Sequence, residues 1–265
     1  MNTVFDIEGE VENPDLVLCE WGENYCSIAG FNAQSKTLHR LRYFSFENAA
    51  TKNDIDVLLD YVKSISSANS KVVFCAAFPE AVLVPKKLYK PELVFLQELY
   101  GTNSMMLADH IGEWQLVNSY SFPPVILQAI RQNFSSATYY HVHTPALKIY
   151  NGFDEAAQIT VHFTPSVFRV VVKKAGQVML VQMYRYKTAL DAVYYLLKIM
   201  EELDMPKVET AVIVSGLVEE SSGLYKELHQ FIQNLQFAKP SHISIKSDLP
   251  PHYFTSLYNL AACVS

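Results

Sequence analysis

The chain has 265 residues, of which 50% are hydrophobic and 18% are charged, and this length suits one large or two smaller domains with buried cores. Its formal net charge of −6 argues against a general nucleic-acid binder, because such proteins neutralise phosphates with lysine and arginine. The first residues lack the basic and apolar regions of a secretory signal, and no apolar run is long enough to cross a bilayer. We therefore expect a cytoplasmic protein without membrane insertion.

The N-terminal residues 1–14 are acidic and polar, and we interpret them as a tail. The segment Leu16–Phe46 then gives three strand-like apolar runs with short turns between them. A helix follows, because Asn53 is a plausible N-cap with Asp56 three residues on, ahead of an apolar stripe at helical spacing. The stripe consists of Ile55, Leu58, Leu59, Val62 and Ile65. The continuously apolar run Val72–Ala77 is typical of a strand covered on both faces.

The four cysteines lie in apolar segments and show no metal-type spacing. If Gly22 and Glu23 formed a two-residue turn, Cys19 and Cys26 would face each other across a hairpin. A disulfide there is the less favoured interpretation, because a reducing cytoplasm keeps buried cysteines as free thiols.

The middle of the chain predicts two or three strands around a helix that begins at Pro123 and Pro124. A strand at Thr138–Val142 then leads through Pro145 into a helical segment. Within this region Asp109 and His110 precede a glycine, which favours a loop with Asp109 as a turn-former over a polar residue lining a cleft. His141 and His143 share a strand face, but no third ligand is attached locally, so strand packing is the preferred interpretation over a metal site.

The second half repeats the order of elements. Three strand-like runs occupy Gln158–Tyr186, and a helix follows that Thr188 caps with Asp191. The apolar run Ala211–Val214 predicts a buried strand. We expect further elements in a helix over Leu224–Leu235, a short strand at His242–Ile245 and a terminal helix from about Tyr253.

Both halves therefore follow the order βββαβαβα, and we predict an α/β protein of two tandem domains, each with a mixed five-stranded sheet flanked by helices. The first domain would span residues 15–152 and the second 153–265, with the boundary in Asn151–Glu155.

Three segments carry a resemblance to a known superfamily. The stretch VIVSGLVEESSGLYKELHQFI is similar to an adenosine motif, HTPALKIYNGF to a first connecting helix, and FTSLYNLAACVS to a second. With the duplicated element order, the chain resembles the ribonuclease-H-like actin, sugar-kinase and heat-shock-protein ATPase superfamily. It looks especially like a bacterial family of uncharacterised actin-like proteins.

The resemblance implies a nucleotide site built from two hairpin turns, each with Asp-x-Gly followed by Ser or Thr. At the first turn Glu20 replaces the aspartate, Gly22 is kept, and Glu23 adds a second negative charge. At the second turn the matching residues include Thr164 without any acid, and Pro165 has no N–H to donate to a phosphate.

The adenosine turn keeps Ser215 and Gly216, while Leu217 stands where a second glycine would be. With the phosphate turns altered, phosphoryl transfer would lose the positioning and metal-borne charge on which it depends. We therefore interpret Glu20, Gly22, Thr164, Ser215 and Gly216 as a vestigial nucleotide cleft, with no cofactor and no catalytic residue.

The favoured hypothesis is a non-catalytic actin-like protein that acts as a protein-binding or scaffold module with an unknown protein partner. The alternative is an ATPase or kinase of the same superfamily that binds ATP with magnesium through a diverged site. Tyrosines beside cationic residues in MYRYK and VYYLLK favour a protein interface, although sheet packing gives the same pattern. His162 fits a hydrogen-bonded structural histidine better than a catalytic one. The sequence leaves monomer and homodimer undecided.

Overall fold

The computed structural model describes residues 1–9, 13–90, 105–149, 157–239 and 243–265. Its contacts divide the chain into two units. The first contains Met1–Ile149, His242–Ser247 and Asn259–Ser265, and the second contains Tyr150–Ser241 and Asp248–Tyr258. The expected boundary at 151–155 lies outside the described residues.

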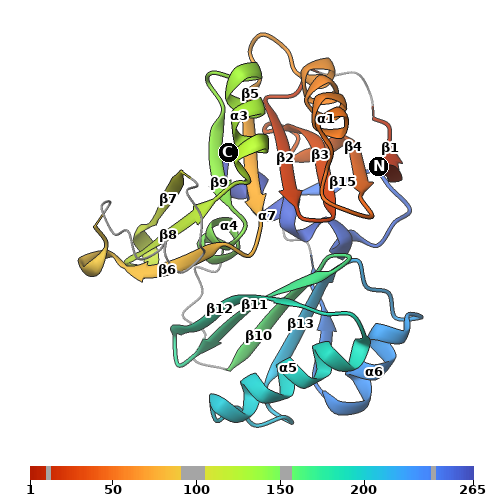
Figure 1. Cartoon of the computed structure of the whole chain (residues 1–265). Helices are drawn as coiled ribbons and strands as arrows, with labels where there is room; N and C mark the ends of the chain where they lie inside the picture. The colour runs from red at the N-terminus through yellow and green to blue at the C-terminus, as the bar shows by residue number, and fades with distance from the viewer. Residues whose placement is uncertain (10–12, 91–104, 150–156, 240–242) are drawn as a thin grey trace. The chain divides into compact units, whose positions relative to one another are not determined.

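The first unit is organised around a seven-stranded mixed sheet (Figure 1). Its strand order is β1-β4-β3-β2-β5-β9, and β15 also pairs with β4. The hairpins β2–β3 and β3–β4 are antiparallel, whereas β5 runs parallel to both β2 and β9. The strands are β1 (Asn2–Ile7), β2 (Leu16–Gly22), β3 (Tyr25–Asn32), β4 (Thr37–Ser45), β5 (Lys71–Ala77), β9 (Thr138–His141) and β15 (Ser244–Ile245).

The N-terminal residues differ from the expected polar tail, because Asn2–Ile7 form the edge strand β1. This strand pairs antiparallel with β4, and Phe5 lies 5.6 Å from Tyr43 between ring centroids. Its acidic residue is neutralised across the pair, since Arg42 Nε lies 2.9 Å from Asp6 Oδ1. Alternating apolar side chains together with this ion pair explain why a polar composition still forms a strand.

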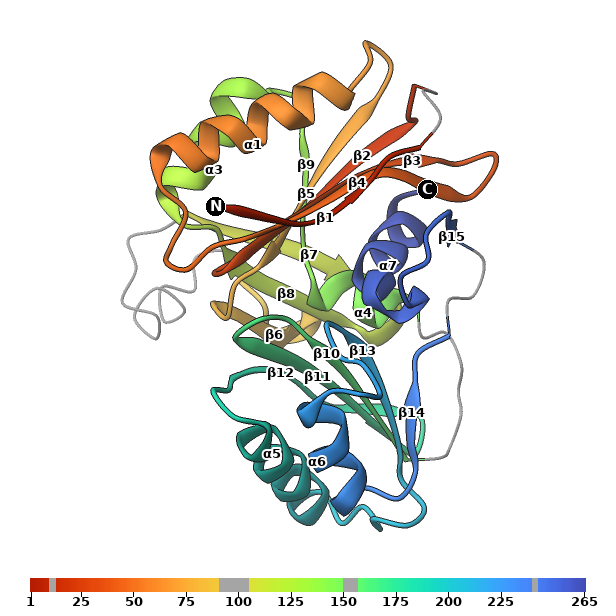
Figure 2. The same ribbon diagram turned by 90° about the vertical axis from the view of Figure 1, so that its right-hand side faces the viewer.

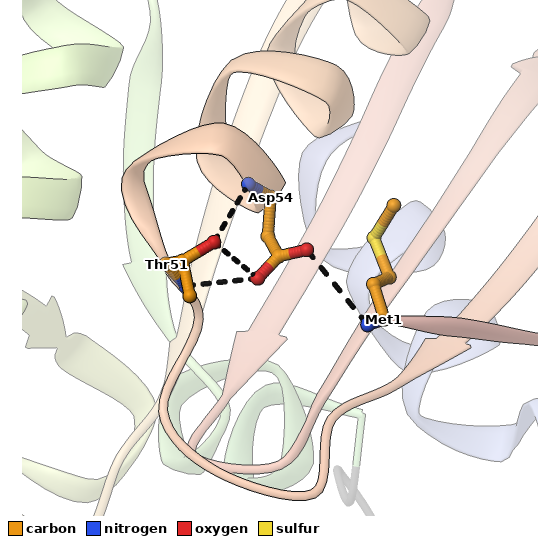
Figure 3. Close-up of polar contacts among 3 residues, drawn as sticks. All are labelled: Met1, Thr51 and Asp54. Carbon is orange, nitrogen blue, oxygen red and sulfur yellow. Dashed lines mark hydrogen bonds and ion pairs between the residues drawn. The ribbon is translucent and has the colours of Figure 1, made fainter.

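Two helices lie side by side over one face of this sheet, α1 (Lys52–Ile65) and α3 (Pro124–Asn133) (Figure 2). The predicted apolar stripe of α1 is buried as expected. The predicted cap is wrong by two positions, because Thr51 caps the helix and forms a capping box with Asp54. Figure 3 shows this box, with the Met1 ammonium 3.8 Å from Asp54 Oδ1. A short helix, α4 (His143–Lys148), follows β9.

A three-stranded antiparallel sheet is inserted between β5 and α3 in the first unit. Its order is β6-β8-β7. The elements are β6 (Ala81–Pro85), η1 (Lys86–Leu88), β7 (Met106–Ile111), η2 (Gly112–Trp114) and β8 (Leu116–Ser121). Asp109 therefore lies within a strand, and its interpretation as a turn-former is wrong.

The second unit has a five-stranded mixed sheet in the order β12-β11-β10-β13-β14. Helices α5 and α6 cover one face (Figure 1), where apolar residues of β10, β11 and β13 form the core. The elements are β10 (Gln158–Phe163), β11 (Val167–Lys174), β12 (Gln177–Arg185), α5 (Ala189–Glu202), β13 (Ala211–Gly216), α6 (Gly223–Phe231), β14 (Leu235–Phe237) and η3 (Pro251–Phe254). The C-terminal helix α7 (Thr255–Val264) is divided between the two units, with Thr255–Tyr258 in the second and the rest in the first. The predicted Thr188–Asp191 capping box is confirmed.

The end of the second half differs from its prediction in two ways. Helix α6 ends at Phe231, and Leu235–Phe237 form β14 beside β13. The short strand near residue 245 pairs with β4 of the first unit's sheet. The predicted five-stranded sheet is present in the second unit, whereas β1 and β15 extend the sheet of the first unit to seven strands. The mixed sheets flanked by helices otherwise agree with the predicted α/β fold.

Candidate functional site

The first hairpin turn is closed by a side chain that the sequence analysis did not single out. Strand β2 ends at Gly22 and β3 begins at Tyr25, so Glu23 and Asn24 form the turn. The Tyr25 ring lies directly against Gly22, where an added Cβ would be 2.4 Å from a ring carbon. Its hydroxyl donates a 2.6 Å hydrogen bond to Oε1 of Glu20. Tyr25 thus joins Glu20 and Gly22 into one closed arrangement.

Packing holds the Tyr25 ring in this position. The ring stacks on Tyr43 at 5.3 Å with an interplanar angle of 3°. Both Tyr25 and Glu20 are almost fully buried, with 4% and 3% exposure. The sequence could have predicted this contact, because in a hairpin with its turn at residues 23–24 the side chains of Glu20, Gly22 and Tyr25 lie on the same face.

On the opposite face of the same hairpin, the Cys19 and Cys26 sulfurs lie 3.6 Å apart, and both cysteines are free thiols. Burial, followed by the contact with Cys19, raises the pKa of Cys26 well above its ordinary value. The Cys26 thiol is therefore held in the neutral, unreactive form.

The second hairpin turn uses its polar groups internally. The Thr164 N–H donates to the Val167 carbonyl at 2.9 Å, and the Thr164 hydroxyl donates to the same oxygen at 2.6 Å. The Thr164 carbonyl accepts from the Tyr186 hydroxyl at 2.8 Å. Pro165 follows Thr164 and has no N–H. Both donors of Thr164 are thus committed within the turn.

Ser215 and Gly216 lie beside this turn, because β10 and β13 pair in parallel with His162 opposite Ser215 and Phe163 opposite Gly216. The Ser215 hydroxyl lies 3.2 Å from the Val161 carbonyl and 3.0 Å from His162 Nδ1. Burial, followed by the nearby Arg169, lowers the pKa of His162 well below its ordinary value. His162 is therefore a neutral, hydrogen-bonded imidazole, as the sequence favoured.

Gly216 has a backbone requirement of its own. Its φ is +83°, and an added Cβ would lie 2.0 Å from the Phe163 carbonyl oxygen. That oxygen accepts the Leu217 N–H at 2.9 Å. The turn then leads into α6, whose first turn is capped by the Ser222 side chain. The strand, turn and helix that the resemblance implied are all present in the second unit.

The five predicted site residues thus form two sets. Glu20 and Gly22 lie together in the first unit, and Thr164, Ser215 and Gly216 lie together in the second. That they are the remnant of a nucleotide site stays a prediction. In the described parts of the chain, no group of three or more histidine, cysteine, aspartate or glutamate side chains is placed to hold a metal ion.

A separate buried polar cluster surrounds Asp109. Its carboxylate accepts hydrogen bonds from the Thr144 hydroxyl at 2.6 Å, the His141 N–H at 2.9 Å and the Tyr120 hydroxyl at 3.1 Å. Burial raises the pKa of Asp109 to about 6, and the three donors oppose that rise. His141 also contacts the Phe78 carbonyl through Nε2 at 2.9 Å, and its ring lies 4.3 Å from that of His143. The cluster connects the inserted sheet to β9 and α4.

Comparisons with known proteins place the chain in a family. The model of a family described as a protein of unknown function, DUF3822, matches residues 12–235. The chain belongs to the DUF3822 family. None of the curated proteins matches this DUF3822 chain in sequence.

Solved structures show the fold of this DUF3822 chain. A Bacteroides thetaiotaomicron protein with an actin-like ATPase fold and unknown function aligns with a TM-score of 0.72 at 14% identity, over 94% of this chain and 95% of that one. A chain of the PilM-PilN type IV pilus biogenesis complex aligns with a TM-score of 0.64 at 10% identity, over 96% and 100%. The predicted actin-like fold is confirmed.

A third structure with this fold is the cytoplasmic domain of EpsL, an inner membrane component of the type II secretion system of Vibrio cholerae. It aligns with a TM-score of 0.50 at 10% identity, over 93% of this chain and 94% of that one. Among the described residues of the DUF3822 chain, no helix has the length and apolar character needed to cross a membrane.

Proposed function

We propose that this DUF3822 protein is a non-hydrolysing member of the actin-like fold that serves as a protein-binding scaffold. The observation that carries the proposal is the Tyr25 ring on Gly22, with the Tyr25 hydroxyl bonded to Glu20. On a working site of this fold, the glycine of the first turn leaves its backbone open to phosphate oxygens. Here an aromatic ring fills that approach.

The state of Glu20 also supports the proposal. A magnesium-organising carboxylate must present its oxygens to the metal or to its water shell. One Glu20 oxygen instead accepts the Tyr25 hydroxyl at 2.6 Å, and the residue is only 3% exposed. The first turn therefore fits a closed structural hairpin better than a magnesium nucleotide.

The hydrogen bonds of the second turn also argue against phosphate binding. Phosphate binding at a turn relies on backbone N–H and hydroxyl donors that face the ligand. Both Thr164 donors are directed at the Val167 carbonyl, and Pro165 contributes no donor. The second turn therefore lacks the donor set that a triphosphate needs.

The structural neighbours support a role in protein assembly. One similar chain was solved in the PilM-PilN complex, and EpsL is a component of a secretion system. Each of them is 10% identical to this chain. They therefore suggest that the actin-like fold can bind a protein partner, but they do not identify the partner of this chain.

A nucleotide-binding ATPase or kinase is the second candidate, and one observation favours it. The strand, the left-handed Gly216 and the capped helix α6 keep the form of an adenosine-binding turn. A nucleoside could bind there without the phosphate contacts.

The deciding experiment is thermal unfolding of the protein titrated with ATP and magnesium, together with a phosphate-release assay. We expect no saturable stabilisation and no turnover in the wild type. Saturable stabilisation of about 3 kcal/mol at a hundredfold excess over Kd, with turnover lost in Glu20→Gln, would overturn the proposal. Glu20→Gln is the appropriate variant because its amide oxygen can still accept from Tyr25. A Gly216 variant is unsuitable, since any side chain there collides with Phe163.

The proposed protein-binding role is tested by a separate experiment. Affinity purification from the native cell with mass spectrometry should recover a stoichiometric protein partner. Because the proposal makes binding independent of nucleotide, recovery should be the same for wild type and Glu20→Gln, and with or without added ATP. A partner released by ATP would instead favour the second candidate.

A further inference from the structure

One edge of the second unit's sheet is long and open. β12 (Gln177–Arg185) is the outermost strand next to β11 (Figure 1), and in the part of the chain that the structure describes no strand pairs with its outer side. The opposite edge strand, β14, has only 3 residues, whereas β12 has 9. An open edge presents a row of unpaired backbone donors and acceptors, and proteins normally protect such rows.

The composition of β12 lacks the usual protection. Charged side chains or proline keep most edge strands from pairing with other chains. From Gln177 to Tyr184 the sequence is QVMLVQMY, without a charge or a proline. A bulge interrupts the pairing with β11 at Met179, and the segment Leu180–Arg185 pairs regularly with β11. The regular part of the edge is therefore uncharged up to Arg185.

Aromatic and aliphatic side chains border this edge. Tyr184 of β12 stacks on Tyr195 of α5 at 4.6 Å, and Tyr194 lies 5.5 Å from Tyr195. Tyr194 is 63% exposed, and Leu190 one turn earlier in α5 is 57% exposed. Exposed tyrosine beside aliphatic side chains is typical of binding surfaces. Tyr184 on the strand edge and the exposed Leu190 and Tyr194 on α5 thus form a surface with apolar and aromatic side chains.

We propose that β12 pairs antiparallel with β12 of a second copy of this chain, about a two-fold axis at Gln182, so that the two five-stranded sheets become one continuous sheet. This inference does not depend on whether the nucleotide site is lost. It gives the protein a homodimeric form in addition to any other partner.

The segment Leu180–Tyr184 is complementary to itself in this register. Leu180 faces Tyr184 of the second copy, and Val181 faces Met183. Gln182 faces Gln182, where the two side-chain amides can each donate to and accept from the other. Both Leu180 and Tyr184 lie on the face covered by α5, because their partners Val172 and Phe168 belong to the core on that face.

The charges also permit a second copy in this register. Arg185 of one copy faces Met179 of the other, so the two arginines stay apart and no like charges meet. In this register Leu180 and Tyr184, which both lie on the face covered by α5, are opposite each other. Helix α5 of each copy therefore lies on the same side of the joined sheet. The exposed Leu190 and Tyr194 would then flank the new strand pair. These features favour a second copy over a charged peptide strand.

The test is sedimentation velocity of the full chain over a range of concentrations, with charge variants at Gln182. Gln182 is exposed, so Gln182→Lys and Gln182→Glu should leave the fold intact. Each variant alone places like charges opposite each other at the axis and should weaken dimerisation at least about tenfold. An equimolar mixture of the two should restore the dimer, because opposite charges then meet. Gln230→Lys and Gln230→Glu, at an exposed position on α6, are matched controls that should dimerise like the wild type.

A disulfide measures the register directly. Residues opposite each other in an antiparallel pair lie about 4.5–5.5 Å apart at Cα, which permits a disulfide bond. Under mild oxidation Gln182→Cys should form a covalent dimer, whereas Gln230→Cys should not. A wild type that stays monomeric at all concentrations would overturn the proposal. So would a dimer that persists in both charge variants, or β12 pairing only with a strand of another protein.

Discussion

The two hairpin turns of this actin-like protein are closed by different means. In the first unit a side chain closes the turn, since Tyr25 covers Gly22 and bonds to Glu20. In the second unit backbone carbonyls are the partners, since the Thr164 N–H and hydroxyl both donate to the Val167 carbonyl and Gly216 fits against the Phe163 carbonyl. A side chain can move by changing rotamer, whereas a backbone contact can change only if the sheet moves. An added side chain should therefore be tolerated far less at Gly216 than at Gly22.

The two units also bury opposite kinds of titratable group. The first buries Asp109, whose pKa is raised to about 6, and the second buries His162, whose pKa is lowered well below its ordinary value. In each case burial penalises the charged form. Raising the pH therefore removes stability at Asp109, whereas lowering the pH below about 6.5 removes stability at His162.

The largest effect is expected for Gly216→Ala. Its Cβ would lie 2.0 Å from the Phe163 carbonyl oxygen, in a strand pair that cannot shift alone. We expect a loss of about 4 kcal/mol or more in the free energy of unfolding, measured by urea titration. Gly176→Ala is the control, because Gly176 also has a positive φ but open space around it. It should cost only about 1 kcal/mol. Equal losses would show that backbone strain alone, and not the contact with Phe163, sets the cost at Gly216.

The next effect is a pH dependence at Asp109. The folded-state pKa of about 6 exceeds the ordinary value of 3.8, so folding favours the protonated carboxyl. The difference in unfolding free energy between wild type and Asp109→Asn should fall by about 2 kcal/mol as the pH rises from about 4 to about 7. Urea titrations of both proteins at several pH values provide the measurement. A difference that stays constant with pH would mean that Asp109 keeps an ordinary pKa in the fold.

Two hydroxyl deletions compare the turns at smaller magnitude. Tyr25→Phe removes a hydrogen bond to the Glu20 carboxylate, and Tyr186→Phe removes one to the Thr164 carbonyl. Because bonds to charged groups are stronger, we expect about 2 kcal/mol for the first and about 1 kcal/mol for the second. Chemical denaturation of the two variants measures both. A larger loss for Tyr186→Phe would show that the bond to the Thr164 carbonyl, and not the bond to the Glu20 carboxylate, is the stronger of the two.

The smallest effect concerns the two matched helix caps. Thr51 begins α1 and Thr188 begins α5, each in a capping box with an aspartate three residues on. Thr51→Ala should cost about 1 kcal/mol of unfolding free energy. Thr188→Ala should lower stability in the same direction, and Thr→Ser at either position should restore most of the loss. Thermal unfolding provides the readout, and an alanine variant as stable as wild type would show that the cap bond is not maintained in solution.

Local patterns in the sequence predicted much of this architecture. Helical spacing predicted the buried stripe of α1, and the Thr188–Asp191 pair predicted the start of α5, because both depend on residues within a few positions of each other. Hydrophobic runs predicted the central strands of the two larger sheets. The duplicated order of these elements then indicated the actin-like fold, which comparison confirmed.

Other features were decided only by contacts between distant segments. The sequence alone did not place Asn2–Ile7 or Ser244–Ile245 beside β4, because strand partners depend on which edges remain open after the sheet forms. Asp109 looked like a turn residue until β7 brought it to Thr144 and His141. The closure of Gly22 by Tyr25 depends on the position of the two-residue turn, since a turn at residues 22–23 would take Gly22 out of strand β2 and put Tyr25 opposite Glu20 instead. The sequence thus determined the elements through local spacing, and the tertiary structure decided their neighbours, because pairing and burial depend on the whole sheet.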